Sequence, residues 1–247
     1  MGKIFTFWSP CHSAGTTTSA ILLANQLSKE YSVCVIDLDL NNSDVGFLLN
    51  IFDSEHNIDN LAPYIVGGSL TADIFKSNLI PVKKFYVLQG TKNTEKAAFF
   101  KQEEIEPVID IARDLFDVVI LNTSPVFDNI ATFLALKKSD MTLIVMNQKL
   151  AHYNKLNKKM NTILNLSSRP FIILNKNMKG LNISAEDIYN MVNIAISPIE
   201  YLPENQIINQ LNLEKNMIDV FFDNRNKRFT NDMQAISEKM KDVMNFQ

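Results

Sequence analysis

Several common features are missing from this 247-residue sequence, and each absence narrows what the chain can be. Only two cysteines are present, Cys11 and Cys34, and their spacing forms no metal-ligand or redox pair, which fits a reduced compartment. The 24 lysines and arginines are balanced by 27 acidic residues, so the net charge of -3 gives no general electrostatic surface for nucleic acid. No stretch approaches the roughly 20 apolar residues that cross a bilayer, and no basic region precedes the first apolar run. We therefore expect a cytoplasmic protein.

Linkers, internal repeats and low-complexity tracts are also lacking, so we predict one domain over residues 1–247. Short apolar segments predict strands at residues 4–8, 33–36, 85–88, 118–121, 141–146, 171–174 and 195–199. Helical periodicity predicts helices at residues 16–29, 103–115, 130–136, 150–166, 185–192, 204–211 and 229–243. Between residues 40 and 81 we expect loops and short helices rather than sheet. This alternation indicates an α/β fold with a doubly wound, mainly parallel sheet and helices on both faces.

The loop after the first predicted strand carries the strongest chemical signal. It contains Cys11-His12-Ser13-Ala14-Gly15-Thr16-Thr17-Thr18. In a phosphate-binding loop, backbone N–H groups at a helix N-terminus point at the phosphates, a lysine supplies charge, and a Ser/Thr hydroxyl binds magnesium. Gly15 occupies the position of the last glycine and Thr17 that of the hydroxyl, but Thr16 stands where the lysine belongs. The loop keeps the backbone part of a phosphate site and lacks its charged part.

Polar residues also close several later apolar segments. They occur in Ile36-Asp37-Leu38-Asp39, in Leu121-Asn122-Thr123-Ser124-Pro125, in Leu174-Asn175-Lys176 and in Tyr201-Leu202-Pro203-Glu204. Open α/β sheets bind ligands at the carboxyl ends of their strands. The sequence therefore points to one site assembled from these strand ends.

Taken in order, these features resemble the MinD/ParA family of deviant Walker A ATPases, whose loop normally reads K-G-G-x-G-K-T-T/S. Aligned on Gly15, the signature lysine of that family falls on Cys11 and its loop lysine on Thr16, and the Walker B aspartate has become Asn122. The resemblance spans nearly the whole chain. It implies a P-loop NTPase fold with a Rossmann-like, three-layer arrangement.

The resemblance also implies a site for ATP and magnesium. Its nucleotide-binding residues would be Cys11, His12, Ser13, Ala14, Gly15, Thr16, Thr17, Thr18, Asn175 at the adenine and Pro203 over the base. Thr17 and Asp37 would hold magnesium, Asp37 by orienting a metal-bound water, and Asp39 would orient the attacking water as the catalytic residue. Acidic residues at a sheet edge also cap helices, so a structural role for both carboxylates stays open.

Hydrolysis depends on neutralising charge on the phosphoryl oxygens, and the groups expected to do this are altered at Cys11, Thr16 and Asn122. We therefore expect a degenerate family member that binds ATP weakly, hydrolyses it weakly or not at all, and serves as a platform for localisation or assembly. Chains with an eroded loop resemble the TadZ/CpaE-like branch, which implies protein partners in pilus or secretion machinery, with conjugation machinery as the neighbouring possibility. A homodimer would be held by surface contacts, because Cys11 cannot reach a phosphate across the interface.

Two alternatives remain open at this point. One is an active ParA/MinD-type ATPase for DNA partitioning or spatial positioning, in which His12 or a partner's cation replaces the lysines. The other is a nucleotide-free structural adaptor. His56 and His152 lack partners at ligand spacing, so we expect no metal other than magnesium. The C-terminal helix mixes Lys239 and Lys241 with acidic residues, and we expect it to pack on the body rather than bind a membrane.

Overall fold

A computed structural model of the chain describes residues 1–51, 55–167, 169–178, 187–188, 190, 197–204, 218–219 and 227–244. In this part of the chain, eight strands form one sheet in the order β3-β4-β2-β5-β1-β6-β7-β8. The strands are β1 (Lys3–Trp8), β2 (Val33–Leu38), β3 (Ile80–Val82), β4 (Phe85–Leu88), β5 (Val118–Thr123), β6 (Met141–Met146), β7 (Pro170–Asn177) and β8 (Ser197–Pro203). Every neighbouring pair is parallel except β3 with β4. The predicted doubly wound, mainly parallel α/β fold is confirmed.

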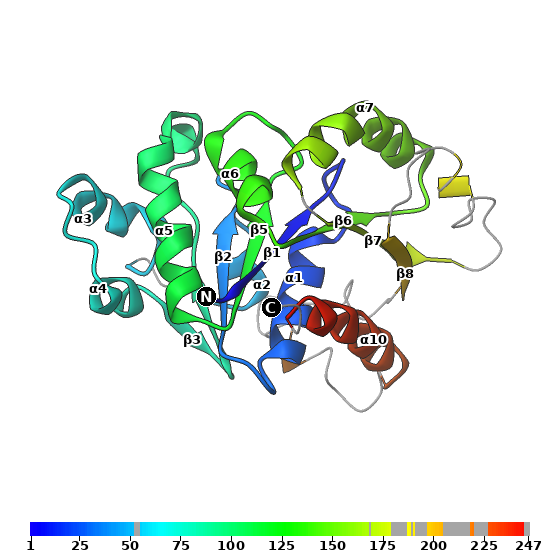
Figure 1. Cartoon of the computed structure of the whole chain (residues 1–247), viewed down its shortest axis with the longest axis horizontal. Coiled ribbons are helices and arrows are strands. Elements are labelled where there is room, and N and C mark those ends of the chain that lie inside the picture. Colours follow the sequence, from blue (N-terminus) through cyan, green and yellow to red (C-terminus); the bar gives the residue numbers. More distant parts are fainter. Residues whose placement is uncertain are drawn as a thin grey trace.

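Helices cover both faces of this sheet. They are α1 (Thr16–Leu27), α2 (Val45–Leu48), α3 (Ala62–Val66), α4 (Ala72–Ser77), α5 (Gln102–Leu115), α6 (Ile130–Lys138), α7 (Leu150–Leu166) and α10 (Lys227–Met244), with 3-10 turns η1 (Ile58–Leu61) and η2 (Thr94–Phe99). Helices α5, α6 and α7 lie on one side of the sheet, and α1 and α10 on the other (Figure 1). The arrangement has three layers, with β1 in the interior of the sheet.

The central strands are mostly apolar before their carboxyl ends because both of their faces are covered. In β2, Val33 and Val35 join the cluster that contains α1 and α10, whereas Cys34 and Ile36 join the cluster that contains α5. A strand buried on both faces gives a continuous apolar run rather than an alternating one. Burial also raises the pKa of the Cys34 thiol far above its ordinary value, so this cysteine is an inert part of the core.

The structure differs from the sequence-based expectation at the sheet edges. Strand β3 overlaps the end of the region, residues 40–81, where no strand was expected. It contains Pro81, which an edge strand tolerates because one side of it makes no ladder hydrogen bonds. The strand expected at 195–199 is observed as β8 at the opposite edge. The helices expected at 185–192 and 204–211 lie almost entirely outside the described residues.

The C-terminal helix α10 packs on the body of the domain. Its residues Met233, Ile236, Met240 and Val243 are buried in the same cluster as α1. Lys241 pairs with Glu30, just after α1, at 2.6 Å. Among the described residues, no helix has both the length and the apolar character that a membrane span requires.

Candidate functional site

The loop between β1 and α1 is closed by a residue from β7. Gly15 has a φ of +89°, and a Cβ placed on it would lie 2.2 Å from Nδ2 of Asn175. The same Nδ2 donates a hydrogen bond to the Ala14 carbonyl at 2.8 Å. Glycine is therefore required at position 15 for two reasons: the left-handed backbone and the close approach of Asn175.

Replacing Gly15 by alanine is expected to lower the free energy of unfolding by about 2 kcal/mol or more, because the left-handed strain of about 1–2 kcal/mol adds to the clash with Asn175. Gly68→Ala is the matched control, since Gly68 also has a positive φ (+63°) but nothing lies within 4 Å of the place that a Cβ would take there. Urea denaturation of both variants measures the difference. Equal losses would show that Asn175 does not press on the loop.

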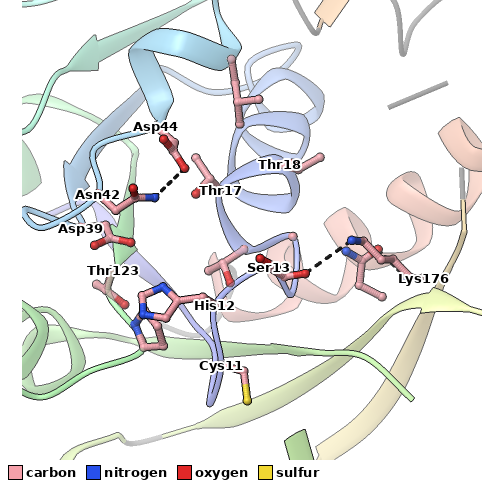
Figure 2. Close-up of a pocket in the computed structure, with 15 residues that line it drawn as sticks. Cys11, His12, Ser13, Thr17, Thr18, Asp39, Asn42, Asp44, Thr123 and Lys176 are labelled. Atoms are coloured by element: carbon pink, nitrogen blue, oxygen red, sulfur yellow. Dashed lines mark hydrogen bonds between the residues drawn. The ribbon is translucent and has the colours of Figure 1, made fainter. Parts of the chain in front are cut away.

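A cavity of about 300 Å³ opens beside this loop. Its lining combines the loop with the carboxyl ends of β2, β5 and β7, as expected for an open α/β sheet. The lining residues are Cys11, His12, Ser13, Gly15, Thr16, Thr17, Thr18, Asp39, Asn42, Asp44, Leu48, Thr123, Pro125, Asn175 and Lys176. Figure 2 shows Asp39, Asn42 and Thr123 on one side of the loop and Lys176 on the other.

Most of the site residues predicted from sequence therefore share one cavity, and four do not line it. Ala14 is buried behind the loop, where its carbonyl accepts from Asn175. Pro203 is at the end of β8 and is absent from the lining. Asp37 and Asn122 are fully buried beneath the cavity rather than in its wall.

The carboxylate of Asp37 is engaged entirely by the protein. Its Oδ1 accepts from Nδ2 of Asn122 at 2.9 Å and from the backbone N–H of Asp39 at 3.2 Å. Its Oδ2 accepts from the Ser43 hydroxyl at 2.7 Å and from the Val45 N–H at 3.2 Å. Burial raises the pKa of Asp37 to about 6, and these hydrogen bonds oppose the rise. Asp37 thus joins β5 to the segment that enters α2.

Asp39 has a different environment. Its side chain lines the cavity and is only 7% exposed, and its Oδ1 has no hydrogen-bond partner among the described residues. Burial and the neighbouring charge of Asp37 raise the pKa of Asp39 to about 7. A bound cation would satisfy this oxygen and favour the ionised form. Thr17 lines the same cavity, so Thr17 and Asp39 together fit a hydrated magnesium ion better than Asp37 does.

Some lining residues were not singled out from sequence. The sequence pattern assigned no separate role to Lys176, Asn42, Thr123 or Pro125, all of which line the cavity. The position of Lys176 at a strand end beside Asn175 was the available signal.

The histidines fall into two environments. His12 is exposed at the cavity, whereas His152 is buried and its Nδ1 accepts from the Asn147 N–H at 3.2 Å. Burial lowers the pKa of His152 to about 4, so this side chain is neutral and fixes the start of α7. No group of three His, Cys, Asp or Glu side chains suited to a metal occurs in the described ranges.

Comparison with known proteins agrees with this geometry. A family model described as an AAA domain (AAA_31) matches residues 11–180, a span that includes the loop, Asp37, Asp39, Asn122 and Asn175. The chain belongs to this family, the MinD/ParA-like P-loop ATPases. The ParA family ATPase of Chlorobium tepidum TLS has the same fold, with a TM-score of 0.83 at 17% identity over 96% of this chain and 99% of that one. So does MinD of Pyrococcus horikoshii OT3, solved with Mg-ADP, with a TM-score of 0.77 at 16% identity over 100% of each chain.

The chain is also similar in sequence to a curated protein. The tyrosine-protein kinase CpsD of Streptococcus pneumoniae serotype 4 is 25% identical over 145 residues, which is 58% of this chain. The match spans 62% of the length of CpsD.

Proposed function

We propose that this family member binds ATP with magnesium weakly, hydrolyses it slowly or not at all, and acts as a platform for protein partners. One observation carries the proposal: the cavity keeps the loop and the hydroxyl and carboxylate ligands of a nucleotide site, but it has neither family lysine. Cys11 and Thr16 occupy the two lysine positions and both line the cavity. The loop therefore keeps the backbone that would bind phosphate, but it lacks the two lysine charges that would promote hydrolysis.

Support for nucleotide binding comes from the start of α1 and from two side chains with oxygen ligands, Thr17 and Asp39. The loop leads directly into α1, whose first N–H groups and dipole favour an anion. Thr17 and Asp39 line the same space, and Asp39 has an unsatisfied oxygen. A bound magnesium ion would neutralise charge on the phosphates, and these two residues would orient its ligands.

Support for slow hydrolysis comes from the Asp37–Asn122 pair. In the family pattern a Walker B carboxylate stands at position 122, but here an amide occupies it and donates to Asp37 at 2.9 Å. An amide carries no negative charge with which to hold a metal-bound water. Losing a single preorganised electrostatic group costs about 10²–10³ in kcat, and here the lysine charges are missing as well.

Support for a platform role comes from apolar side chains around the cavity. Phe47 is 57% exposed, Val126 41% and Leu150 60%. Phe47 precedes the lining residue Leu48, and Val126 follows the lining residue Pro125. Leu150 begins α7, next to Ala151, whose carbonyl lies 3.9 Å from the Cys11 sulfur. A protein partner or a second copy of the chain would cover these side chains, and we propose partners from pilus, secretion or conjugation machinery.

Thermal unfolding with and without MgATP tests the binding step. ATP at about 100 times its Kd adds about 2.7 kcal/mol, which for a chain of this size raises the Tm by about 5–10 °C. Phosphate release measured in parallel is expected to stay near the background. No rise in Tm would favour a structural adaptor without nucleotide. Robust turnover that disappears in Asp39→Ala would instead identify an active ParA/MinD-type ATPase.

A further inference from the structure

Lys176 brings an ammonium group to the loop from the end of β7. Its backbone has a φ of +53°, a left-handed conformation that is uncommon for lysine, and its N–H donates to Oδ1 of Asn175 at 2.8 Å. Its Nζ donates to the Ser13 carbonyl at 3.4 Å, an interaction that Figure 2 marks with a dashed line. The side chain is exposed and lines the cavity. A cation therefore stands at the loop although both lysine positions within the loop are lost.

Other lysines near the site are placed differently. Lys159 donates to the Pro125 carbonyl at 2.6 Å, and its Nζ lies 5.6 Å from the Trp8 ring centroid and 5.4 Å from that of Phe127. Lys149 and Lys155 are exposed around α7 and do not line the cavity. Within the described residues, Lys176 is the only lysine or arginine in the cavity wall.

The other charged side chains that line the cavity would oppose an anionic ligand, which Lys176 would attract. Asp39 and Asp44 also line the cavity and repel phosphate when ionised. Asp39 is more than nine-tenths buried with an oxygen that has no partner, which marks the site as incomplete without a ligand. In the described part of the chain, no carboxylate forms an ion pair with Lys176, so its charge remains available to a ligand.

We infer that Lys176 supplies the positive charge to the polyphosphate of a nucleoside triphosphate in this loop, replacing from β7 the lysines that the loop lacks. The inference rests on the proposed function, since it names a binding residue of the same site. Lys176 also touches the Ser13 carbonyl, so a purely structural role in holding the loop has to be separated from a role of its charge.

Two substitutions separate these roles. Lys176→Gln keeps a donor for the Ser13 carbonyl and removes the charge, whereas Lys176→Arg keeps the charge. Isothermal titration calorimetry with MgATP and with magnesium tripolyphosphate measures the affinity of each variant. The Gln variant is expected to lose about 10-fold or more in affinity, because charge-assisted hydrogen bonds are stronger than those between neutral groups. The Arg variant is expected to bind with near wild-type affinity. Lys155→Ala, a neighbouring lysine outside the cavity, is expected to bind as the wild type does.

The outcomes distinguish the inference from the proposed function. Wild-type binding with unchanged affinity in Lys176→Gln overturns the role of Lys176 and leaves nucleotide binding intact. Equal losses in the Gln and Arg variants, for ATP and tripolyphosphate alike, overturn the charge role in favour of a structural one. If the wild-type chain binds neither ligand, the proposed function fails and the inference fails with it.

Discussion

A Thr16→Lys variant is expected to bind MgATP about 10- to 100-fold more tightly than the wild-type chain. Thr16 is the first residue of α1 and lines the cavity next to Thr17, so a lysine there starts at the wall of the proposed phosphate site. Hydrogen bonds to charged groups contribute about 1.5–3 kcal/mol, and each 1.4 kcal/mol is a factor of ten in affinity. Isothermal titration of wild type and variant under the same salt concentration measures the change.

Thr16→Gln is the control for this variant, because it adds length and hydrogen-bond donors without charge. Its affinity is expected to stay close to that of the wild type. The double variant Thr16→Lys with Lys176→Gln adds a further check, since two cations serving the same phosphates should not act additively. If Thr16→Lys binds no more tightly than Thr16→Gln, the phosphates do not lie against this loop, and the proposed site is wrong.

The sheet followed from sequence, and most residues predicted for the site share one cavity, because both depend on local pattern. Continuous apolar runs such as Val33–Ile36 predict strands buried on both faces, and β2 has this environment. Parallel strands place their carboxyl ends at one edge, so the loop after β1 and the polar residues at the ends of β2, β5 and β7 were expected on the same edge of the sheet. Gly15 was assigned from its motif position, and its left-handed φ of +89° fits that assignment.

The sequence could not predict that Asp37 is hydrogen-bonded within the protein whereas Asp39 lines the cavity. The two residues are separated by one position, and their environments differ because of partners distant along the chain. Asn122, which is 85 positions away along the chain, donates a hydrogen bond to the Asp37 carboxylate. Asp39 lies just beyond the end of β2 and faces the cavity. Lys176 could not be assigned from sequence for a similar reason, since its left-handed backbone and its N–H bond to Oδ1 of Asn175 at the end of β7 appear only in the fold.

The strand β3 shows the limit of pattern at the edge of the sheet. It has only three residues, includes Pro81, and pairs with β4 alone. So short a segment gives no periodicity to detect, and its strand conformation depends on the tertiary pairing of Ile80 with Val87 and Val82 with Phe85.

Asn122→Asp is expected to destabilise the chain without magnesium by about 3 kcal/mol at pH 8, because it places a second buried carboxylate against Asp37. The wild-type amide donates to Asp37 Oδ1 at 2.9 Å, and both side chains are fully buried. At that separation two carboxylates cannot both ionise without a cation, so the variant replaces an attraction with a repulsion.

The loss should depend on pH in a defined direction. Burial already raises the pKa of Asp37 from 3.8 to about 6, and a second carboxylate raises it further. Between about pH 4 and pH 8 the folded variant then holds more protons than the unfolded chain, so its stability falls as pH rises. At pH 5 the pair shares a proton and the loss is small. Millimolar magnesium is expected to restore little of the stability at pH 8, because both side chains lie beneath the cavity rather than in its wall.

Urea denaturation at pH 5 and pH 8, with and without magnesium, tests this expectation. Asn122→Ala is the control, since it removes the amide without adding charge and is expected to cost about 1–2 kcal/mol with a weaker pH dependence and no response to magnesium. The comparison of Asn122→Asp with Asn122→Ala tests whether the amide at position 122 holds Asp37 and the start of α2 in place without a metal. A variant as stable as the wild type at pH 8 without magnesium would show that the Asp37–Asn122 bond has no such role.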